Sequence, residues 1–435
     1  MKWLLATLLI LILALVFNLG LVAYAMYALL GALLISRLLT RTWTGNLTAE
    51  RRSSALTANV GQTVAVTVRI KNDGWLPIPW FLWHDALPGR ALMFHPPALK
   101  ISGYRIGVAM LRGGGTKNAI YQLTCNRRGY YQIGPVVVET GDLFGLHRRF
   151  RVLGQPHFLL VYPPVVPLEA YSIASRRPVG EVRMTYRLFE DPTRIAGIRF
   201  YQPGDPLRRV HWRATARTGR LHSKVYEPST VAGATILLDF HQRSYPPHNE
   251  PHRSELAVVA AASIAGAVHQ MGQQVGLVTN GRDAVDRIRQ EGWAGQARSR
   301  ESALEAVAMR AQSDRLQPVI VPTRHSPDQL LRIVETLARV ELTDGLTLEQ
   351  LIAETESRLP RSATVVAILT SFPRETALAL DNLRRGGYAV TVVLNVHDEV
   401  EFADMAVPLV ACGIDVLHLK SQETVAALCR RFVLR

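Results

Sequence analysis

The feature that most constrains this chain is a long stretch without charge near its start. Residues 3–35 carry no charged side chain and form two apolar blocks, residues 3–17 and 21–35, separated by Asn18, Leu19 and Gly20. A single helix of this length would rise about 50 Å, well beyond the ~30 Å hydrocarbon core of a bilayer. Because Asn and Gly are typical turn residues, the pattern predicts two short membrane-spanning helices joined by a tight turn.

The flanking charges predict how this hairpin is oriented. Basic residues stand on both sides of it: Lys2, Arg37, Arg41, Arg51 and Arg52. By the positive-inside rule, both ends of the hairpin face the cytoplasm, so we expect a multi-pass protein of the cell inner (plasma) membrane whose soluble domains are cytoplasmic. The bilayer then contacts residues 3–36. A secretory signal peptide cut after Ala25 is the alternative, but that cut would leave the apolar residues 26–35 at the new terminus.

Length and cysteine usage narrow the class of protein further. The 435 residues are 48% hydrophobic, which excludes a disordered chain and allows two or three domains of ordinary size. The three cysteines are far apart and form no C-x-x-C pair, which argues against a disulfide scaffold, a zinc knuckle and a thioredoxin-like dithiol. This usage indicates a reducing compartment.

Two soluble domains of different kinds follow the hairpin. Apolar and polar residues alternate with a period of two in residues 63–70, and clusters such as Asn72-Asp73-Gly74 mark turns. We therefore predict an all-β, antiparallel β-sandwich over residues 42–168. From residue 233 on, short apolar runs alternate with helical stretches, which predicts an α/β domain with a doubly wound parallel sheet over residues 233–435.

The expected strands of this α/β domain indicate where a ligand site would lie. They cover residues 234–239, 275–278, 363–370, 389–394 and 414–419. We expect a helix over residues 253–271 and one after each of the strands at 363–370, 389–394 and 414–419. Ligands of such sheets bind at the carboxyl ends of the strands. The polar residues at those ends are Asp239, Thr279, Thr370 and Ser371.

A basic segment lies between the two domains. Residues 199–224 contain seven Lys and Arg and one Asp, so they supply +6 of the net charge of +15. Pro203-Gly204 predicts a turn, Asp205 a helix N-cap, Pro206 the first helical residue and Gly219 the helix stop. The sequence therefore predicts a short helix that carries Arg209, Arg213 and Arg217 on one face.

This basic segment has two interpretations. Arginine binds carboxylate and phosphate through paired donors, so the segment is a candidate surface for a phosphate-bearing ligand, an anionic lipid or an acidic protein. Alternatively, it is a solvated helix face whose arginines pair with Glu190, Asp191 and Glu227. Under either interpretation, we expect Trp212 and Tyr201 to pack in a core or an interface.

The same residues resemble the signature of a bacterial family, domain-of-unknown-function family 58. The resemblance is carried by Tyr201-Gln202-Pro203-Gly204-Asp205, Arg208, His211-Trp212, Ala216-Arg217 and Gly219. It implies four parts: a transmembrane hairpin (residues 1–41), a β-domain (42–168), the signature segment (169–232) and a von Willebrand factor A-like, Rossmann-type domain (233–435). It also implies a MoxR-type AAA+ ATPase as partner. The residues expected to bind that partner are Arg199, Tyr201, Gly204, Asp205, Arg208, His211, Trp212, Arg213, Arg217 and Lys224.

The resemblance also raises the question of a metal. A von Willebrand factor A domain with a working site holds Mg²⁺ through Asp-x-Ser-x-Ser after its first strand and through a later Thr and Asp. Here Asp239 is followed by His241 and Arg243 in place of the serines, and Ser371 stands where the second carboxylate would be. One carboxylate is too little for a hard divalent cation, so we expect a degenerate site with no metal and no cofactor.

A zinc site in the following loop is also disfavoured. The loop contains His241, His248, Glu250 and His252, but Pro251 prevents the helical spacing of an H-E-x-x-H motif.

Motifs of common enzyme classes are absent from the sequence. There is no Gly-Lys dipeptide and hence no Walker A loop, no G-x-S-x-G elbow, and no G-x-G-x-x-G after a strand. We therefore expect a non-enzymatic, membrane-anchored adaptor or scaffold. Two alternatives stay open: a basic surface that binds nucleic acid or anionic lipid, and a hydrolase that uses Asp239 and His241. Nucleic acid is disfavoured because stacking aromatics are sparse in the basic segment.

Overall fold

The computed structural model describes residues 2–93, 96–142, 147–168, 190–202, 210–228, 233–285, 316–361 and 363–428. The chain forms two compact units. The first combines Met1–Pro164 with Gly281–Leu316 and Val334–Gly345, and the second combines Val165–Asn280, Gln317–Ile333 and Leu346–Arg435.

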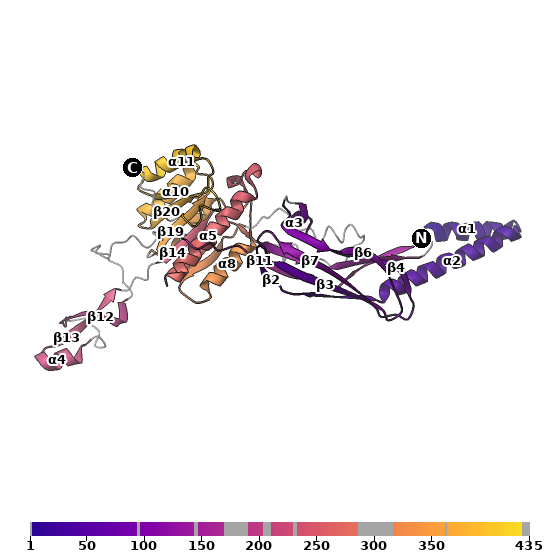
Figure 1. Cartoon of the computed structure of the whole chain (residues 1–435), viewed down its shortest axis with the longest axis horizontal. Helices are drawn as coiled ribbons and strands as arrows, with labels where there is room; N and C mark the ends of the chain where they lie inside the picture. The colour runs from indigo at the N-terminus through magenta and orange to yellow at the C-terminus, as the bar shows by residue number, and fades with distance from the viewer. Residues whose placement is uncertain are drawn as a thin grey trace. The chain divides into compact units, whose positions relative to one another are not determined.

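Two apolar helices open the first unit. α1 (Lys2–Val16) and α2 (Gly20–Gly45) run antiparallel (Figure 1) and join through Asn18, whose φ of 52° is left-handed. By length and composition, α2 alone is long enough to cross a membrane, and α1 is a shorter apolar helix. The predicted apolar N-terminal helix is therefore confirmed, whereas the second span stays a prediction.

Strands that follow α2 make up most of the first unit. Their described bounds, with those of one short helix, are β1 (Leu47–Ser53), β2 (Thr57–Asn59), β3 (Thr63–Asn72), β4 (Ile78–Asp85), α3 (Gly89–Met93), β5 (Leu99–Gly103), β6 (Ile106–Leu111), β7 (Thr116–Cys125), β8 (Gly129–Ile133), β9 (Val136–Gly141), β10 (Arg148–Leu153), β11 (His157–Tyr162), β16 (Arg282–Asp283) and β18 (Val340–Glu341).

We call β1 to β11 the β-domain. Its two four-stranded sheets, ordered β1-β3-β7-β5 and β10-β9-β4-β6, are antiparallel throughout, as predicted, and β2-β11-β8 form a smaller third sheet. The period of two places every second side chain of β3 inside, so that Val64, Val66, Val68 and Ile70 are buried in one core that both large sheets share. The alternation in the sequence therefore identified the inner face of β3.

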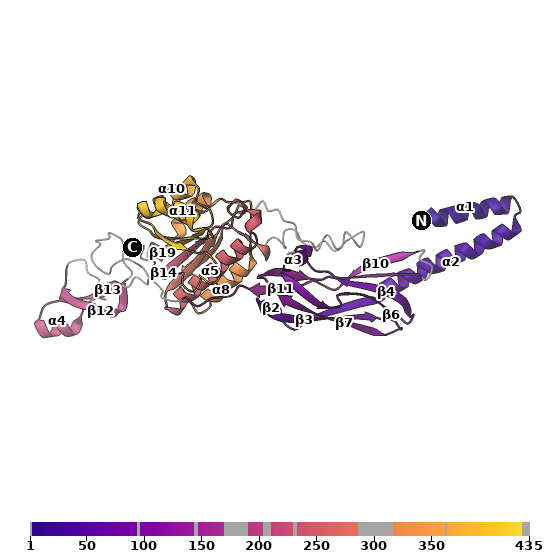
Figure 2. The same cartoon turned by 45° about the horizontal axis from the view of Figure 1, so that its top comes forward.

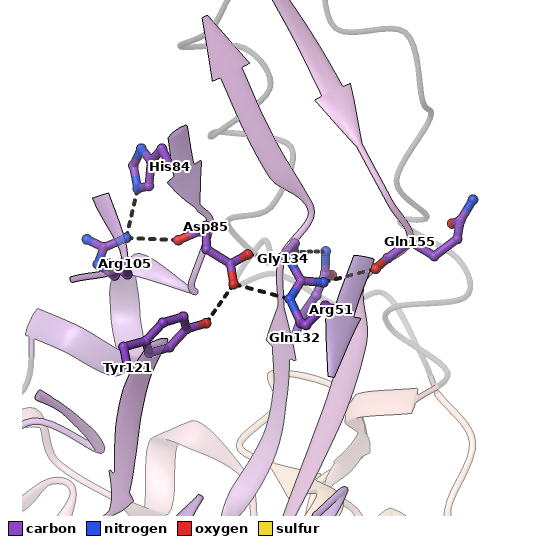
Figure 3. A network of polar contacts seen from close by, with 8 residues as sticks. All are labelled: Arg51, His84, Asp85, Arg105, Tyr121, Gln132, Gly134 and Gln155. Atoms are coloured by element: carbon purple, nitrogen blue, oxygen red, sulfur yellow. Dashed lines mark hydrogen bonds and ion pairs between the residues drawn. The ribbon is translucent and has the colours of Figure 1, made fainter. Parts of the chain in front are cut away.

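A buried ion pair connects the two large sheets (Figure 3). Arg51 of β1 lies against Asp85 of β4, and their side chains are 2% and 1% exposed. The Tyr121 hydroxyl of β7 donates to Asp85 Oδ2 at 2.7 Å, and burial followed by the charge of Asp85 raises the pKa of this phenol. Gly134 is required beside the pair, because its φ of +84° is left-handed and a Cβ there would collide with the Arg51 guanidinium.

The second unit contains a hairpin and a larger sheet with its helices. The bounds are β12 (Glu190–Phe200), α4 (Trp212–Thr218), β13 (His222–Pro228), β14 (Gly233–Leu238), η2 (Gln242–Ser244), η3 (Pro247–Asn249), α5 (His252–Gln270), β15 (Gln274–Thr279), β17 (Val319–Arg324), α8 (Gln329–Arg339, shared with the first unit), α9 (Leu348–Thr355), η4 (Glu356–Arg358), β19 (Ala363–Leu369), α10 (Arg374–Arg385), β20 (Ala389–Leu394), α11 (Glu399–Ala411) and β21 (Asp415–His418).

The larger sheet has the order β17-β15-β14-β19-β20-β21, and its five strands from β15 to β21 are parallel. The chain moves from β14 to β15 in one direction and from β19 to β21 in the other. Because such crossovers are right-handed, α5 covers one face and α10 and α11 cover the other (Figures 1 and 2). The strand order therefore reverses between β14 and β19, which is where ligands of open α/β sheets bind.

Two features of this sheet differ from the sequence expectation. β17 was not predicted and pairs antiparallel with β15, as edge strands of otherwise parallel sheets often do. Residues 420–428 after β21 form turns instead of the expected helix. All five strands predicted for this sheet are present within one residue of their expected bounds.

Removing one partner of the buried ion pair should destabilise the β-domain strongly. Asp85→Ala leaves the Arg51 charge buried without its partner, so we expect a loss of about 3–5 kcal/mol in the free energy of unfolding. Urea unfolding of the full chain in detergent, followed by tryptophan fluorescence, measures this loss.

The double variant Arg51→Met/Asp85→Ala removes both charges, so it should cost less than Asp85→Ala alone. Lys100→Ala, an exposed change on β5, serves as the control and should have little effect. An equal or larger loss in the double variant would contradict this role of the pair.

Candidate functional site

The signature segment folds as a hairpin with a short helix between its strands. We call residues 190–202 and 210–228 the signature hairpin. β12 and β13 pair antiparallel, with Arg199 opposite Ser223 and Phe200 opposite His222. The helix α4 ends at Gly219, whose φ of 69° is left-handed and whose N–H donates to Thr215 O at 2.9 Å. Gly219 therefore ends the helix as its sequence position predicted.

The start of this helix differs from the prediction. α4 begins at Trp212, and His211 is its N-cap, because His211 Nδ1 accepts a hydrogen bond from Ala214 N at 3.0 Å. Val210 pairs with Ser223 in a β-bridge, so the helix does not extend back through it. Gly204, Asp205 and Arg208 lie outside the described residues, and so does Arg209 of the predicted arginine face.

Apolar and basic side chains are exposed together on the signature hairpin. Trp212 is 66% and Phe200 60% exposed, so the core alternative for Trp212 is wrong, while Tyr201 is half-buried. Within the described part of the chain, Arg213 and Arg217 form no ion pair. The exposed large side chains and the basic groups of this surface are Ile198, Arg199, Phe200, Trp212, Arg213, Arg217, Arg220, Leu221 and Lys224.

The second candidate site lies at the carboxyl edge of the larger sheet. Asp239 directly follows β14 and is 3% exposed. Its Oδ1 accepts hydrogen bonds from Asn280 Nδ2 at 2.8 Å and from His241 N at 3.2 Å, and its Oδ2 accepts one from Ser244 Oγ at 2.5 Å. The Tyr245 hydroxyl donates to the backbone carbonyl of Asp239 at 2.8 Å. The carboxylate thus joins the loops that follow β14 and β15.

Burial raises the pKa of Asp239, although the bonds from Ser244, Asn280 and His241 act in the opposite direction. These donors direct their hydrogens at both carboxylate oxygens, so a cation would have to displace them. Among the described residues, no group of three His, Cys, Asp or Glu side chains could hold a metal. The arrangement at Asp239 is that of a structural carboxylate.

The other residues of the expected degenerate metal site have different surroundings. His241 is buried, and its Nδ1 accepts a hydrogen bond from Arg243 N at 3.2 Å, whereas the Arg243 side chain is exposed. Ser371 is half-buried after β19. Asp239 bonds the backbone of His241 and not its ring, so it does not orient the imidazole as a catalytic carboxylate would.

The residues considered for zinc have other roles. His248 and His252 are exposed, and Glu250 accepts a hydrogen bond from Ser254 N at 3.0 Å at the start of α5. Glu250 therefore satisfies a backbone donor of the first turn of this helix.

Sequence reasoning missed Ser244 and Asn280 at the Asp239 site and Phe200 on the signature hairpin. Asn280 directly follows Thr279, which the sequence analysis named as a polar residue at the end of this strand, so the same rule applied to one more residue would have found it. Ser244 has no such signal, because its contact depends on the turn of η2. Among the described residues, no hydrogen bond or ion pair joins the signature hairpin to Asp239 or His241.

Removing the Asp239 carboxylate should destabilise the second unit. Asp239→Ala leaves the donors of Ser244, Asn280 and His241 without their acceptor, and we expect a loss of at least about 2 kcal/mol in the free energy of unfolding. Urea unfolding followed by circular dichroism checks this value.

Asp239→Asn keeps one acceptor oxygen and should cost less, and Asp404→Ala, an exposed change on α11, is the control. Millimolar Mg²⁺ should leave the unfolding midpoint of the unmodified chain unchanged. A midpoint that rises with Mg²⁺ and stays constant in Asp239→Ala would contradict the structural role.

Comparisons with known proteins agree with part of this description. The family described as "Protein of unknown function DUF58" matches residues 197–299, which include most of the signature hairpin and Asp239. The chain is similar to the uncharacterized protein YeaD of Bacillus subtilis (strain 168), with 26% identity over 264 residues. That match covers 60% of this chain and 62% of YeaD, so the chain spans less than two thirds of this relative.

Solved structures resemble parts of the chain only weakly. The CARDB domain of PF1109 from Pyrococcus furiosus matches with 15% identity and a TM-score of 0.19, covering 26% of this chain and 86% of that domain. The PapD-like domain 7 of human CEP192 matches with 17% identity and a TM-score of 0.18, covering 28% and 85%. Spo0M of Bacillus subtilis matches with 11% identity and a TM-score of 0.17, covering 27% and 49%.

Proposed function

We propose that this protein is a non-enzymatic adaptor of the inner membrane that presents its signature hairpin to a cytoplasmic protein partner, a MoxR-type AAA+ ATPase. The exposed set of Trp212, Phe200, Arg213 and Arg217 is the observation that carries this proposal. Tryptophan and arginine are the residue types that most often dominate protein–protein binding energy, and aromatic residues are enriched in interfaces.

Three properties of this surface favour a protein partner. Large apolar side chains alternate with basic ones, so a partner would bury apolar area and pair charges in the same contact. Arg213 and Arg217 are four residues apart on α4 and therefore lie on one side of it. Since they form no ion pair within the described residues, binding an acidic surface would not first break an internal pair.

The Asp239 site supports the non-enzymatic part of the proposal. Its carboxylate is buried and accepts three hydrogen bonds from its own chain, and it does not contact the His241 ring. A general acid or base needs access to the substrate, which this carboxylate lacks at 3% exposure. The strand order 3-2-1-4-5-6 of the larger sheet supports a von Willebrand factor A-like domain, a fold in which Asp239 takes the position of the first metal ligand.

The membrane arrangement is part of the same proposal. α2 supplies one span by length and composition, and α1 supplies the second as a short helix packed antiparallel against it. The basic residues Arg37 and Arg41 at the end of α2 then place the soluble units in the cytoplasm.

The first test is purification of the full chain from membranes in mild detergent, with and without Mg²⁺-ATP, followed by mass spectrometry of the proteins that co-purify. We expect a AAA+ ATPase whose recovery depends on nucleotide. Recovery of lipid or nucleic acid alone would contradict the adaptor function.

Charge reversal on α4 tests the surface itself. Arg213→Glu/Arg217→Glu should reduce ATPase recovery at least about tenfold, because two pairs of opposite charges become repulsive. Trp212→Ala should have a similar effect through the lost apolar contact.

Arg358→Glu/Arg374→Glu makes the same charge change at two exposed arginines elsewhere in the second unit and is the matched control. Equal recovery in the α4 variant and in this control, with native circular dichroism in both, would overturn the proposed surface. Binding that falls steeply between roughly 50 and 300 mM salt would instead indicate a nucleic-acid or phosphate ligand.

A further inference from the structure

The end of α2 is held at two points, by His147 directly before β10 and by Arg151 within β10. Near the membrane end, Ser36 Oγ lies 3.0 Å from His147 Nδ1. At the other end, Arg151 Nη1 donates to the backbone carbonyls of Thr44 at 3.2 Å and Gly45 at 2.7 Å. Arg151 thus places a cation on the free carbonyls of the helix C-terminus, an arrangement that stabilises the helix.

The two contacts place α2 and β10 side by side in the same direction. From Ser36 to Thr44 the helix rises about 12 Å at ~1.5 Å per residue. From His147, directly before β10, to Arg151 the chain covers about 13 Å if it is extended at ~3.3 Å per residue. Because alternate residues of a strand share a face, Arg149 lies on the same face of β10 as Arg151, which contacts α2.

Three arginines consequently gather between these two contacts. Arg37 and Arg41 occupy successive turns of α2, and Arg149 stands between His147 and Arg151 on β10. The pKa of Arg149 is lowered by desolvation first, and then by the charges of Arg41 and Arg37. We call Arg37, Arg41 and Arg149 the arginine cluster.

The arginine cluster has no acidic partner in the described residues. Among the residues that the structure describes, no ion pair involves Arg37, Arg41 or Arg149, and the charges named as lowering the pKa of Arg149 are those of Arg41 and Arg37. Three like charges held together by the fold repel one another, and a bound anion would remove that cost. Arg41 and Arg149 are exposed and Arg37 is half-buried, so all three remain accessible.

The position of the cluster identifies the anion. The apolar run of α2 ends at Ile35, and Arg37 and Arg41 lie about 3 Å and 9 Å further along the helix axis at ~1.5 Å per residue. The headgroup layer on each side of the hydrocarbon core is about 5–7 Å thick, so the cluster lies at the depth of lipid phosphates or just outside it. Guanidinium groups bind phosphate oxygens through paired hydrogen bonds.

We propose that Arg37, Arg41 and Arg149 form a binding site for the phosphate of an anionic phospholipid headgroup, built jointly by the end of α2 and by β10. The site rests on the membrane span of the proposed function, but it is independent of the partner that the signature hairpin binds. An occupied site fixes the β-domain against the membrane surface, because one headgroup contacts both the transmembrane helix and a strand of the sheet.

Lipid-dependent stabilisation of the full chain tests the site. The unfolding midpoint is measured in neutral detergent micelles that contain phosphatidylglycerol, phosphatidylcholine or inorganic phosphate. Phosphatidylglycerol should raise the midpoint of the unmodified chain in a saturable manner, whereas the other two should not. In Arg37→Gln/Arg41→Gln/Arg149→Gln, the apparent affinity for phosphatidylglycerol should fall about 100-fold. This value follows because each basic residue near the membrane surface contributes ~1 kcal/mol to binding an anionic lipid.

The matched control is Arg52→Gln/Arg69→Gln/Lys117→Gln, which removes three exposed positive charges from β1, β3 and β7 and should keep the affinity of the unmodified chain. Without anionic lipid, the cluster variant should be at least as stable as the unmodified chain, because it relieves repulsion. This result also shows that the variant folds.

Two results would overturn the proposal: an equal affinity loss in the cluster and control variants, or equal stabilisation by inorganic phosphate. The membrane span is tested separately by measuring whether the cluster variant and the unmodified chain float with membranes in a density gradient. A variant that floats but has lost lipid-dependent stabilisation supports the site, and a chain that does not float even when unmodified contradicts the anchor of the proposed function.

Discussion

The buried contact between Arg51 and Asp85 is the interaction on which the first unit depends, because it joins the two large sheets of the β-domain inside their common core. A charge at this depth is tolerated only with its partner, so the pair constrains how β1 and β4 can face each other. β1 begins two residues after α2 ends, and the position of the helix therefore follows from that of the sheet. The contacts of His147 and Arg151 with α2 extend the same constraint to the helix.

The three candidate sites differ in whether their charged groups have partners within the chain. At Asp239 the fold surrounds a buried carboxylate with donors of its own chain. Arg213 and Arg217 of the signature hairpin and the three arginines of the arginine cluster form no ion pair among the described residues. The first arrangement stabilises the fold, whereas the other two are suited to binding an external anion or acidic surface. Our functional proposals therefore rest on the unpaired cations rather than on the carboxyl edge of the sheet.

Much of the architecture could be predicted because it follows local rules. The period of two in β3, the uncharged run of α1 and α2, and the alternation of strands and helices after residue 233 all appear in the structure. β17 was missed because its short apolar run ends in Pro322 and Arg324, and its pairing with β15 is decided by the edge of the sheet. The start of α4 was misplaced because the sequence Asp205-Pro206 is typical of a helix start, whereas the bridge of Val210 to Ser223 depends on β13.

The uncharged N-terminal run, the kinds of secondary structure and the concentration of positive charge in residues 199–224 follow from composition and from neighbours within a few positions, so they can be read from the chain alone. Which distant residues meet depends on the fold. It brought Arg149 to Arg37 and Arg41, Asp85 to Arg51, and Asn280 to Asp239, across 34 positions or more. Such contacts are set by sheet order and helix packing, which bring together residues that no local pattern in the chain relates.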